Sequence, residues 1–240
     1  MLSQFLELGI ATRDVAAALA FYESLGFVQA PVGDAWPHPY AVVTDGRLCL
    51  GLHGLDFGEP RLTFVAPDLR TRLGRLQDLG IEVEHARLDE ASLNEATFRD
   101  PAHHPVRLLE ARTFSSPALE PRHESVLGYF EEYLLATEDP SAAGRFWEQL
   151  GFVAFVADDP ATGRVVASSR DLNLAFEDLA LDAPLLCFTS ANVRERIATL
   201  GARGFAFARR LPRAVAQRDR EAALLLAPDG VHMLLLQADE

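Results

Sequence analysis

The stretch FYESLGF at residues 21–27 recurs as FWEQLGF at residues 146–152, 125 positions later. Each copy closes a helical pattern and ends in Leu-Gly-Phe, where glycine suits the left-handed backbone position that follows a helix. A repeat at this spacing in a chain of 240 residues predicts two tandem copies of one small α/β domain.

Each copy is itself duplicated. The helical pattern that begins at Asp14 recurs from Asp68, and the one that begins at Asp139 recurs from Asn192. Asp and Asn can cap a helix, and a glycine closes each of the four patterns, at Gly26, Gly80, Gly151 and Gly204. Apolar strand-like runs precede the four caps, at residues 5–11, 62–66, 133–137 and 185–189. Shorter runs follow each helix, so the predicted order is βαβββ, four times over.

The periodicity breaks between the two halves. Residues 113–128 contain Ser115-Ser116-Pro117 and Pro121, a composition typical of a linker. The sequence therefore predicts a first domain at 1–112, a linker at 113–128 and a second domain at 129–240, each domain with two βαβββ units.

Composition narrows the partners. A formal net charge of −13 disfavours nucleic acid and anionic membranes, which reward clustered positive charge. The chain has no run of about 20 apolar residues and no signal-peptide pattern, so we expect a soluble cytoplasmic protein. Cys49 and Cys187 lie in apolar runs and are expected to be reduced and structural. All 22 basic residues are arginine, which excludes a lysine Schiff base.

Together with the βαβββ units, the motif at 21–27 and 146–152 and the turn sequences at 100–105 and 227–230 resemble the vicinal oxygen chelate superfamily. Its members include glyoxalase I, extradiol dioxygenases and bleomycin- or fosfomycin-resistance proteins. The resemblance covers residues 5–112 and 132–237. It implies an α+β fold in which the units form two cupped mixed β-sheets with helices outside, and a divalent metal held by His or Glu from the first and last strands of the units.

The resemblance also marks where such metal ligands would lie. The first-strand positions carry Glu7, Arg61, Glu132 and Leu185, and the last-strand positions carry Gly51, Arg107, Ala175 and Leu234. Three or four donors are needed, and neither cup offers more than one carboxylate. We therefore expect no metal and no cofactor, unless a one-residue slip in register has displaced the ligands and a divalent metal is bound after all.

In the first cup, Glu7, Arg61 and Arg107 would converge with a surplus positive charge. Such a group could clamp a carboxylate or phosphate of a ligand, or form an internal salt-bridge cluster. We expect His53 at the rim as a ligand contact. Trp36 and Tyr40 belong to a proline-stiffened aromatic segment that either stacks on a planar ligand or forms a hydrophobic lid.

In the second cup, the counterpart positions of Glu132 are apolar, so burial is expected to raise the pKa of Glu132 toward that of a general base. His232 shares the strand face of Leu234 and is the nearest candidate acid–base partner.

The leading hypothesis is thus a metal-independent small-molecule-binding protein, similar in role to the sequestering resistance proteins of the superfamily. One alternative is an enzyme, either a lyase or isomerase that uses Glu132 and His232 or a metal-dependent glyoxalase or dioxygenase. Another is a structural or regulatory module. The sequence leaves open which units pair within a cup, and a monomer or a homodimer is expected.

Overall fold

The computed structural model describes residues 2, 4–32, 36–89, 93–111, 125–157 and 163–238, and it contains two mixed β-sheets. The first sheet has the strand order β2-β3-β4-β1-β5-β8-β7-β6. Its strands are β1 (Gln4–Ala11), β2 (Val28–Ala30), β3 (Tyr40–Thr44), β4 (Cys49–His53), β5 (Arg61–Ala66), β6 (Val83–Arg87), β7 (Glu95–Arg99) and β8 (Pro105–Glu110). Helices α1 (Val15–Ser24) and α2 (Leu69–Asp78) belong to the same half.

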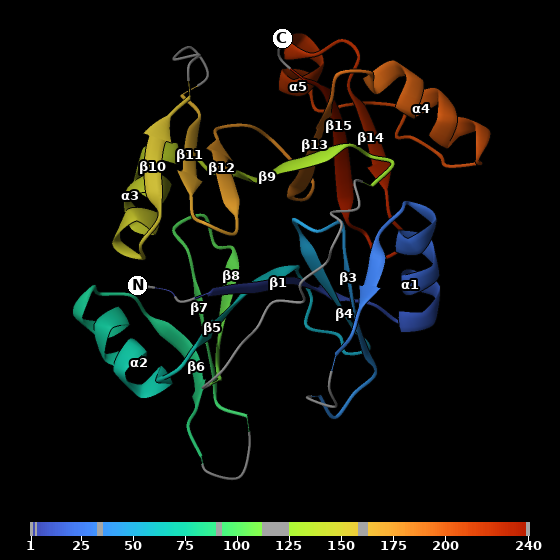
Figure 1. Cartoon of the computed structure of the whole chain (residues 1–240). Helices are drawn as coiled ribbons and strands as arrows, with labels where there is room; N and C mark the ends of the chain where they lie inside the picture. The colour runs from blue at the N-terminus through green and yellow to red at the C-terminus, as the bar shows by residue number, and fades with distance from the viewer. Residues whose placement is uncertain are drawn as a thin grey trace.

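The second sheet has the order β10-β11-β12-β9-β13-β15-β14. Its strands are β9 (Tyr129–Ala136), β10 (Val153–Val156), β11 (Val165–Ser168), β12 (Asn173–Glu177), β13 (Leu185–Ser190), β14 (Ala223–Leu226) and β15 (His232–Gln237). The helices of this half are α3 (Pro140–Gln149), α4 (Val193–Ala202) and α5 (Arg213–Arg218). The two large mixed sheets confirm the predicted fold class (Figure 1).

The helices begin where the capping residues predict. Asp14 and Asp139 each accept a hydrogen bond from the backbone N–H three residues later, at 3.0 and 2.8 Å, and Asp68 does the same for Thr71 at 3.0 Å. Asn192 departs from the pattern, because its side chain bonds Ser190 and Glu195 and makes no cap hydrogen bond. Three of the four predicted caps therefore act through their side chains.

The pairing of units follows from the central strands. In the first sheet β1 pairs antiparallel with β5, so the first unit completes a sheet with the second. In the second sheet β9 pairs antiparallel with β13, so the third unit does the same with the fourth. Each half thus builds its own cup. We call the face of the first sheet that carries Glu7 the first cup, and the face of the second sheet that carries Glu132 the second cup.

The fourth unit differs from the predicted plan. After α4, Phe207 makes only an isolated bridge to Leu225, and the helix α5 follows before β14. Among the described residues this unit therefore has two strands after its helix instead of three, and the second sheet has seven strands where the first has eight. The arginine-rich segment 209–220 lacks the alternation that a strand at this edge would need.

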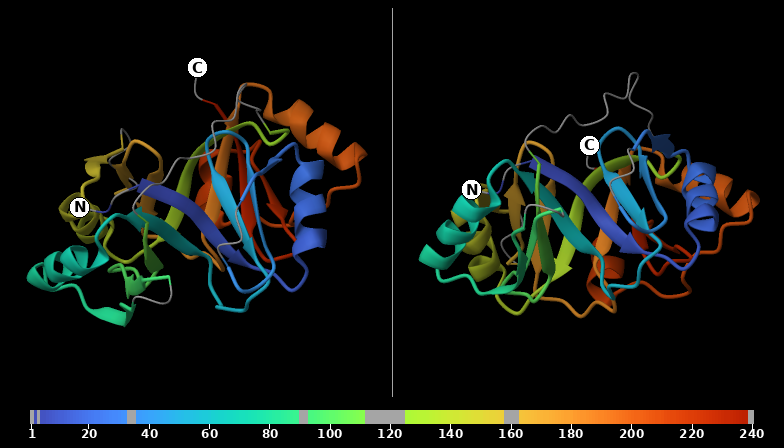
Figure 2. Two further views of the ribbon diagram at one scale, coloured as in Figure 1. Left: turned by 60° about the horizontal axis from the view of Figure 1, so that its bottom comes forward. Right: turned by 90° about the horizontal axis from the view of Figure 1, so that it is seen from below.

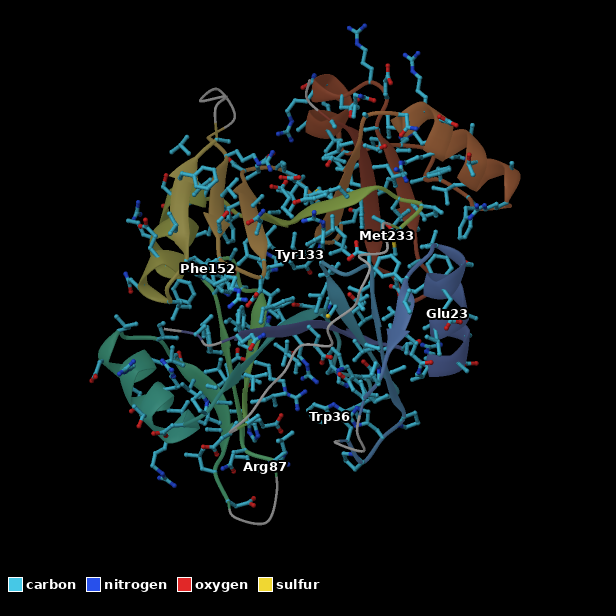
Figure 3. All side chains as sticks on the ribbon, in the orientation of Figure 1. Glu23, Trp36, Arg87, Tyr133, Phe152 and Met233 are labelled. Carbon is cyan, nitrogen blue, oxygen red and sulfur yellow. The ribbon has the colours of Figure 1, made fainter. Side chains whose placement is uncertain are left out.

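The repeated motif joins the two halves. Trp147 of α3 donates to the buried Asp100 in the β7–β8 turn at 3.3 Å, and Tyr22 of α1 donates to Asp229 in the β14–β15 turn at 3.0 Å. One hydrophobic cluster runs through both sheets, and Figure 3 shows Tyr133, Phe152 and Met233 in the region between the halves. Helices α1 and α4 lie at one end of the molecule and α2 and α3 at the other (Figure 2). The cups therefore lie on the outer faces of the two sheets.

Most of the predicted linker, up to residue 124, lies outside the described residues. Its last part, residues 125–128, forms a turn in which Ser125 bridges Gly128 just before β9. The independence of the two halves as domains stays a prediction. None of the helices in the described ranges is both long and apolar enough to cross a bilayer.

Candidate functional site

The first cup brings the predicted ligand positions together. Gly9 of β1 lies opposite Gly51 of β4 and Arg61 of β5, and Thr63 of β5 lies beside Arg107 of β8. A Cβ placed on Gly51 would lie only 2.1 Å from the Glu7 carboxylate. The Glu7 side chain therefore lies directly over Gly51, as the predicted register requires.

Glu7 is the centre of a buried hydrogen-bonded chain. Its Oε1 lies 2.9 Å from His53 Nε2, and its Oε2 accepts a hydrogen bond from the Tyr40 hydroxyl. The other ring nitrogen of His53 lies 3.0 Å from His38 Nε2. Glu7 and His53 are both fully buried, so His53 lies in the interior of the cup and not at its rim as predicted. This chain can carry a proton between the partly exposed His38 and the buried carboxylate.

Burial sets the protonation of two members of this chain. It raises the pKa of Tyr40 well above its usual range, and the neighbouring Glu7 carboxylate raises it further, so the phenol stays protonated and donates. Burial also lowers the pKa of His38, and the adjacent His53, Arg107 and Arg61 lower it further. His38 is therefore neutral near pH 7 and available as a proton acceptor.

The two predicted arginines have other partners than Glu7. Arg107 donates to Glu95 through Nε at 2.8 Å and through Nη2, and its guanidinium lies 4.3 Å from the ring centre of Trp36. Arg61 lies 3.7 Å from the ring centre of Phe57. Within the described part of the chain, no ion pair joins Glu7 to either arginine. Glu95, which sequence reasoning missed, supplies the carboxylate instead.

The second cup contains an open hollow of about 1080 Å³. Its apolar lining includes Leu134, Val166, Cys187 and Leu234. Its charged lining comprises Glu131, Glu132, Glu177, Asp219 and Glu221 with Arg164, Arg218 and Arg220. Arg218 binds both oxygens of Glu177, at 2.8 and 2.7 Å. Arg164 binds Glu132 and lies 3.4 Å from Glu177. Two carboxylates and two guanidiniums therefore form one electrically balanced network along the wall.

Glu132 and His232 are not brought together. Burial raises the pKa of Glu132, as predicted, while Arg164 opposes the shift. Glu132 lies in the row of Cys187 and Leu234, whereas His232 lies opposite Leu185, two residues along the strand. Two strand spacings and two residues separate the backbones by about 12 Å. His232 does not line the hollow and shares no described hydrogen bond with Glu132, so their acid–base pairing stays a prediction.

The missed residue Glu177 follows a simple rule. It lies two residues beyond Ala175, just as His53 lies two residues beyond Gly51, and both share a strand face with the predicted ligand position. Both residues are buried. His53 contacts the first-strand carboxylate of Glu7 directly, and Glu177 contacts Arg164, which binds the first-strand carboxylate of Glu132. Alternation along the strand could therefore have identified Glu177. Arg164 immediately precedes β11 and Arg218 ends α5, and nothing in the repeat marks either residue.

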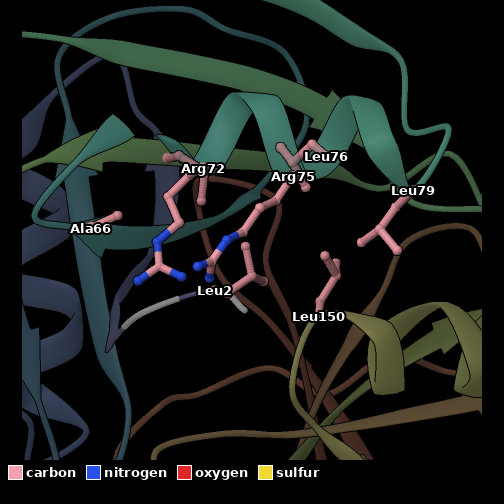
Figure 4. A pocket seen from close by; sticks show the side chains of 8 residues that line it. Leu2, Ala66, Arg72, Arg75, Leu76, Leu79 and Leu150 are labelled. Atoms are coloured by element: carbon pink, nitrogen blue, oxygen red, sulfur yellow. The ribbon is translucent and has the colours of Figure 1, made fainter. Parts of the chain in front are cut away.

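A crevice away from both cups is too small to bind a ligand. The crevice between α2 and Leu150 has a volume of about 10 Å³, room for one water molecule at most (Figure 4). Its lining is mostly leucine, with Arg72 and Arg75 on one side.

The donor sets of the two cups do not match the metal site that the resemblance implies. The four positions carry one carboxylate with two arginines and a glycine in the first cup, and one carboxylate with apolar residues in the second. No group of three or more His, Cys, Asp or Glu side chains in the described ranges is placed to hold a metal ion. No step through a metal is therefore assigned to either cup.

No protein-family model matches the sequence, and no curated protein matches it. Solved structures do match its fold. Catechol 2,3-dioxygenase is similar with a TM-score of 0.61 at 15% identity, over 100% of this chain and 89% of that one. A variant of homoprotocatechuate 2,3-dioxygenase from Brevibacterium fuscum has a TM-score of 0.64 at 15% identity, over 99% of this chain and 72% of that one. An extradiol ring-cleaving dioxygenase from B. fuscum, solved at room temperature, has the same TM-score and identity, over 100% and 72%.

These neighbours correct one expectation. We expected no cofactor, but the matching structures are extradiol dioxygenases, a class for which the resemblance implies a divalent metal. This comparison therefore contradicts the expectation that the chain works without a metal, and that expectation is wrong. The fold prediction is confirmed, because the neighbours span the whole chain and belong to the predicted group. The chain has the fold of the vicinal oxygen chelate superfamily, with one cup built by each half.

Proposed function

We propose that this chain is a small-molecule-binding protein whose second cup holds the ligand. The hollow over the second sheet supports this proposal, because its volume of about 1080 Å³ is close to the upper limit of about 1,000 Å³ for small-molecule sites. An apolar floor with a few polar groups around it is the usual composition of such sites.

The lining indicates the chemistry of the ligand. The floor is apolar, and Phe155 and Val156 on the edge strand β10 are 51% and 59% exposed beside the hollow. Ser168, Asn173 and Thr189 add hydrogen-bonding groups. The lining as a whole carries more carboxylates than guanidiniums, which favours a neutral or cationic ligand over an anion. The site suits an amphipathic molecule with a large apolar body.

A blocking variant tests this proposal. Thr189 lines the hollow from β13 and is only partly buried, so Thr189→Trp places a large ring in the hollow at small cost to the core. Thr199→Trp on the exposed side of α4 is the matched control. Compounds that raise the melting temperature of the wild type in a library screen should lose this effect in Thr189→Trp and keep it in Thr199→Trp. Retention in both variants, or the absence of any stabilising compound, would contradict the proposal.

The same ligands separate binding from catalysis. If Glu132 acts as a general base, Glu132→Gln should abolish turnover of the ligand and leave its binding intact. If the chain only binds, wild type and variant should both return the ligand unchanged, as mass spectrometry of the incubated mixture would show. The lyase, isomerase and structural alternatives are decided by this pair of measurements.

A ring-cleaving dioxygenase is the candidate that the structural neighbours raise, although likeness at 15% identity carries the fold alone. Its test is direct. Protein purified without chelator is analysed for bound metal and then incubated with catechol and oxygen, with and without added Fe²⁺ or Mn²⁺. Formation of a ring-opened product would replace the binding proposal by this one.

A further inference from the structure

The first cup contains three buried polar atoms without a hydrogen-bond partner. They are Arg61 Nε, Thr63 Oγ1 and Arg107 Nη1. Thr63 is fully buried, and Arg107 is 4% exposed. A buried donor without a partner destabilises a folded chain, so three such groups on two neighbouring strands are unusual.

The three atoms belong to one small area. Arg61 and Thr63 are two residues apart on β5 and therefore share a face, and Thr63 lies directly beside Arg107 on β8. Arg107 already uses Nε and Nη2 to bind Glu95, which leaves Nη1 as its remaining edge. All three groups can donate a hydrogen bond, so what they lack is an acceptor.

The charges around this area favour an anion as that acceptor. Three guanidiniums lie near only two carboxylates: those of Arg61, Arg107 and Arg87 near those of Glu95 and Glu7. The carboxylate of Glu95 is shared by Arg87 and Arg107. Burial and the nearby charge of Arg107 together lower the pKa of Arg61 to about 10, although Glu95 and Glu7 act in the opposite direction. The two guanidiniums therefore repel each other without a full counter-charge, and an anion between them would relieve this repulsion.

The surroundings are aromatic. Trp36 lies against the guanidinium of Arg107 and Phe57 against that of Arg61. The Trp36 ring also lies 5.5 Å from His53 and 6.0 Å from Tyr40, measured between ring centres. Figure 3 shows Trp36 and Arg87 on the side of the first sheet that faces away from the second half. The aromatic rings that stack on these guanidinium groups also offer a surface on which a planar ligand can stack.

We propose that the first cup is a second ligand site, which binds the carboxylate of a small planar organic acid through Arg107, Thr63 and Arg61, with the ring of the acid against the aromatic groups. A carboxylate oxygen accepts from Arg107 Nη1 and Thr63 Oγ1, and Arg61 Nε approaches the other oxygen. This site is independent of the hollow in the second cup, and Thr189→Trp leaves it untouched.

Benzoate is the probe, and Trp36 is the reporter. The chain has two tryptophans, and the other one, Trp147, is fully buried in the core. Titration with benzoate at constant ionic strength should change the tryptophan emission saturably, and Trp36→Phe should remove the change. Benzamide, the neutral isostere, and inorganic phosphate, which is not planar, should bind at least about tenfold more weakly.

Two variants and one control decide the assignment. Arg107→Gln should weaken benzoate binding about tenfold or more. The control Arg170→Gln, at a residue whose side chain is 95% exposed, should not change it. Thr63→Val should weaken binding several-fold while the melting temperature of the free protein stays the same or rises, because the hydroxyl has no partner there to lose. This last result does not depend on the folding of Arg107→Gln.

The proposal is overturned if benzamide or phosphate binds as well as benzoate, if no saturable change occurs, or if Arg107→Gln keeps the wild-type affinity. It is equally overturned if Thr63→Val lowers the melting temperature of the free protein and leaves the benzoate affinity unchanged. That outcome would mean that the hydroxyl has a structural role only.

Discussion

Gly51 allows the buried carboxylate of Glu7 to occupy the centre of the first cup, so Gly51→Ala is a direct test of that arrangement. A Cβ at residue 51 would lie 2.1 Å from Glu7 Oε2, and ordinary contact begins at 3.4 Å. The carboxylate therefore has to retreat by about 1.3 Å. A retreat of this size breaks the hydrogen bonds from His53 and Tyr40.

The expected loss follows from those two bonds. Hydrogen bonds to a charged group contribute roughly 1.5–3 kcal/mol each, and replacing glycine by alanine in a regular element returns about 0.5–1 kcal/mol. We expect Gly51→Ala to lower the free energy of unfolding by about 3 kcal/mol, measured by urea denaturation. The control is Gly74→Ala in α2, where an added Cβ meets nothing within 4 Å. That variant should be more stable than the wild type by about 0.8 kcal/mol.

A double-mutant cycle identifies the cause. In a Glu7→Ala background the carboxylate is gone, so Gly51→Ala should then cost less than about 1 kcal/mol. An equal cost in both backgrounds would refute the proposed contact, because the alanine would then be meeting some other group. No loss in the wild-type background would refute it as well.

Three further outcomes follow from the fold. Asp14→Ala should lower the free energy of unfolding, measured by urea denaturation, by about 1 kcal/mol, and Asn192→Ala should lower it clearly less. Of these two residues, Asp14 makes a cap hydrogen bond and Asn192 does not. Equal losses would contradict this reasoning. Trp147→Phe leaves the buried Asp100 without the indole donor and should lower the free energy of unfolding by about 1–3 kcal/mol. An unchanged free energy of unfolding would mean that this hydrogen bond does not form. Burial raises the folded-state pKa of Glu132, so the contribution of Glu132 to stability is complete below pH 4.5 and declines as the pH rises through the folded-state pKa. The free energy of unfolding of the wild type, relative to that of Glu132→Gln, should therefore fall from acid toward neutral pH. A rise would contradict the assignment.

The two cups favour different kinds of ligand. The first contains a buried Glu7–His53–His38 chain beside two arginines with unused donors, which favours a charged planar ligand. The second contains a large hollow with apolar side chains and a surplus of carboxylates in its lining, which favours a neutral or cationic amphipathic one. A duplicated chain can thus carry two sites of different chemistry on one fold.

The sequence by itself determined the four units, three of the four helix caps and the strand register. These features depend on contacts between residues only a few positions apart, such as Asp14 with Ala17, and on the alternation that places Glu7 over Gly51. The repeated motif then carried the register from one unit to the next. For the same reason the fold could be predicted although no protein-family model and no curated protein matches the sequence.

Only the tertiary structure decided which groups meet. The partner of Arg107 comes from the neighbouring strand β7, and that of Glu132 from just before β11, one strand beyond its neighbour β12. No local pattern indicates that Glu95 or Arg164 would reach them. The choice depends on strand order, on the length of a side chain and on the cost of leaving a buried charge without a partner. The sequence alone therefore placed the candidate residues on their strands. Which units share a cup, and which groups meet inside it, depend on contacts that exist only once both sheets have formed.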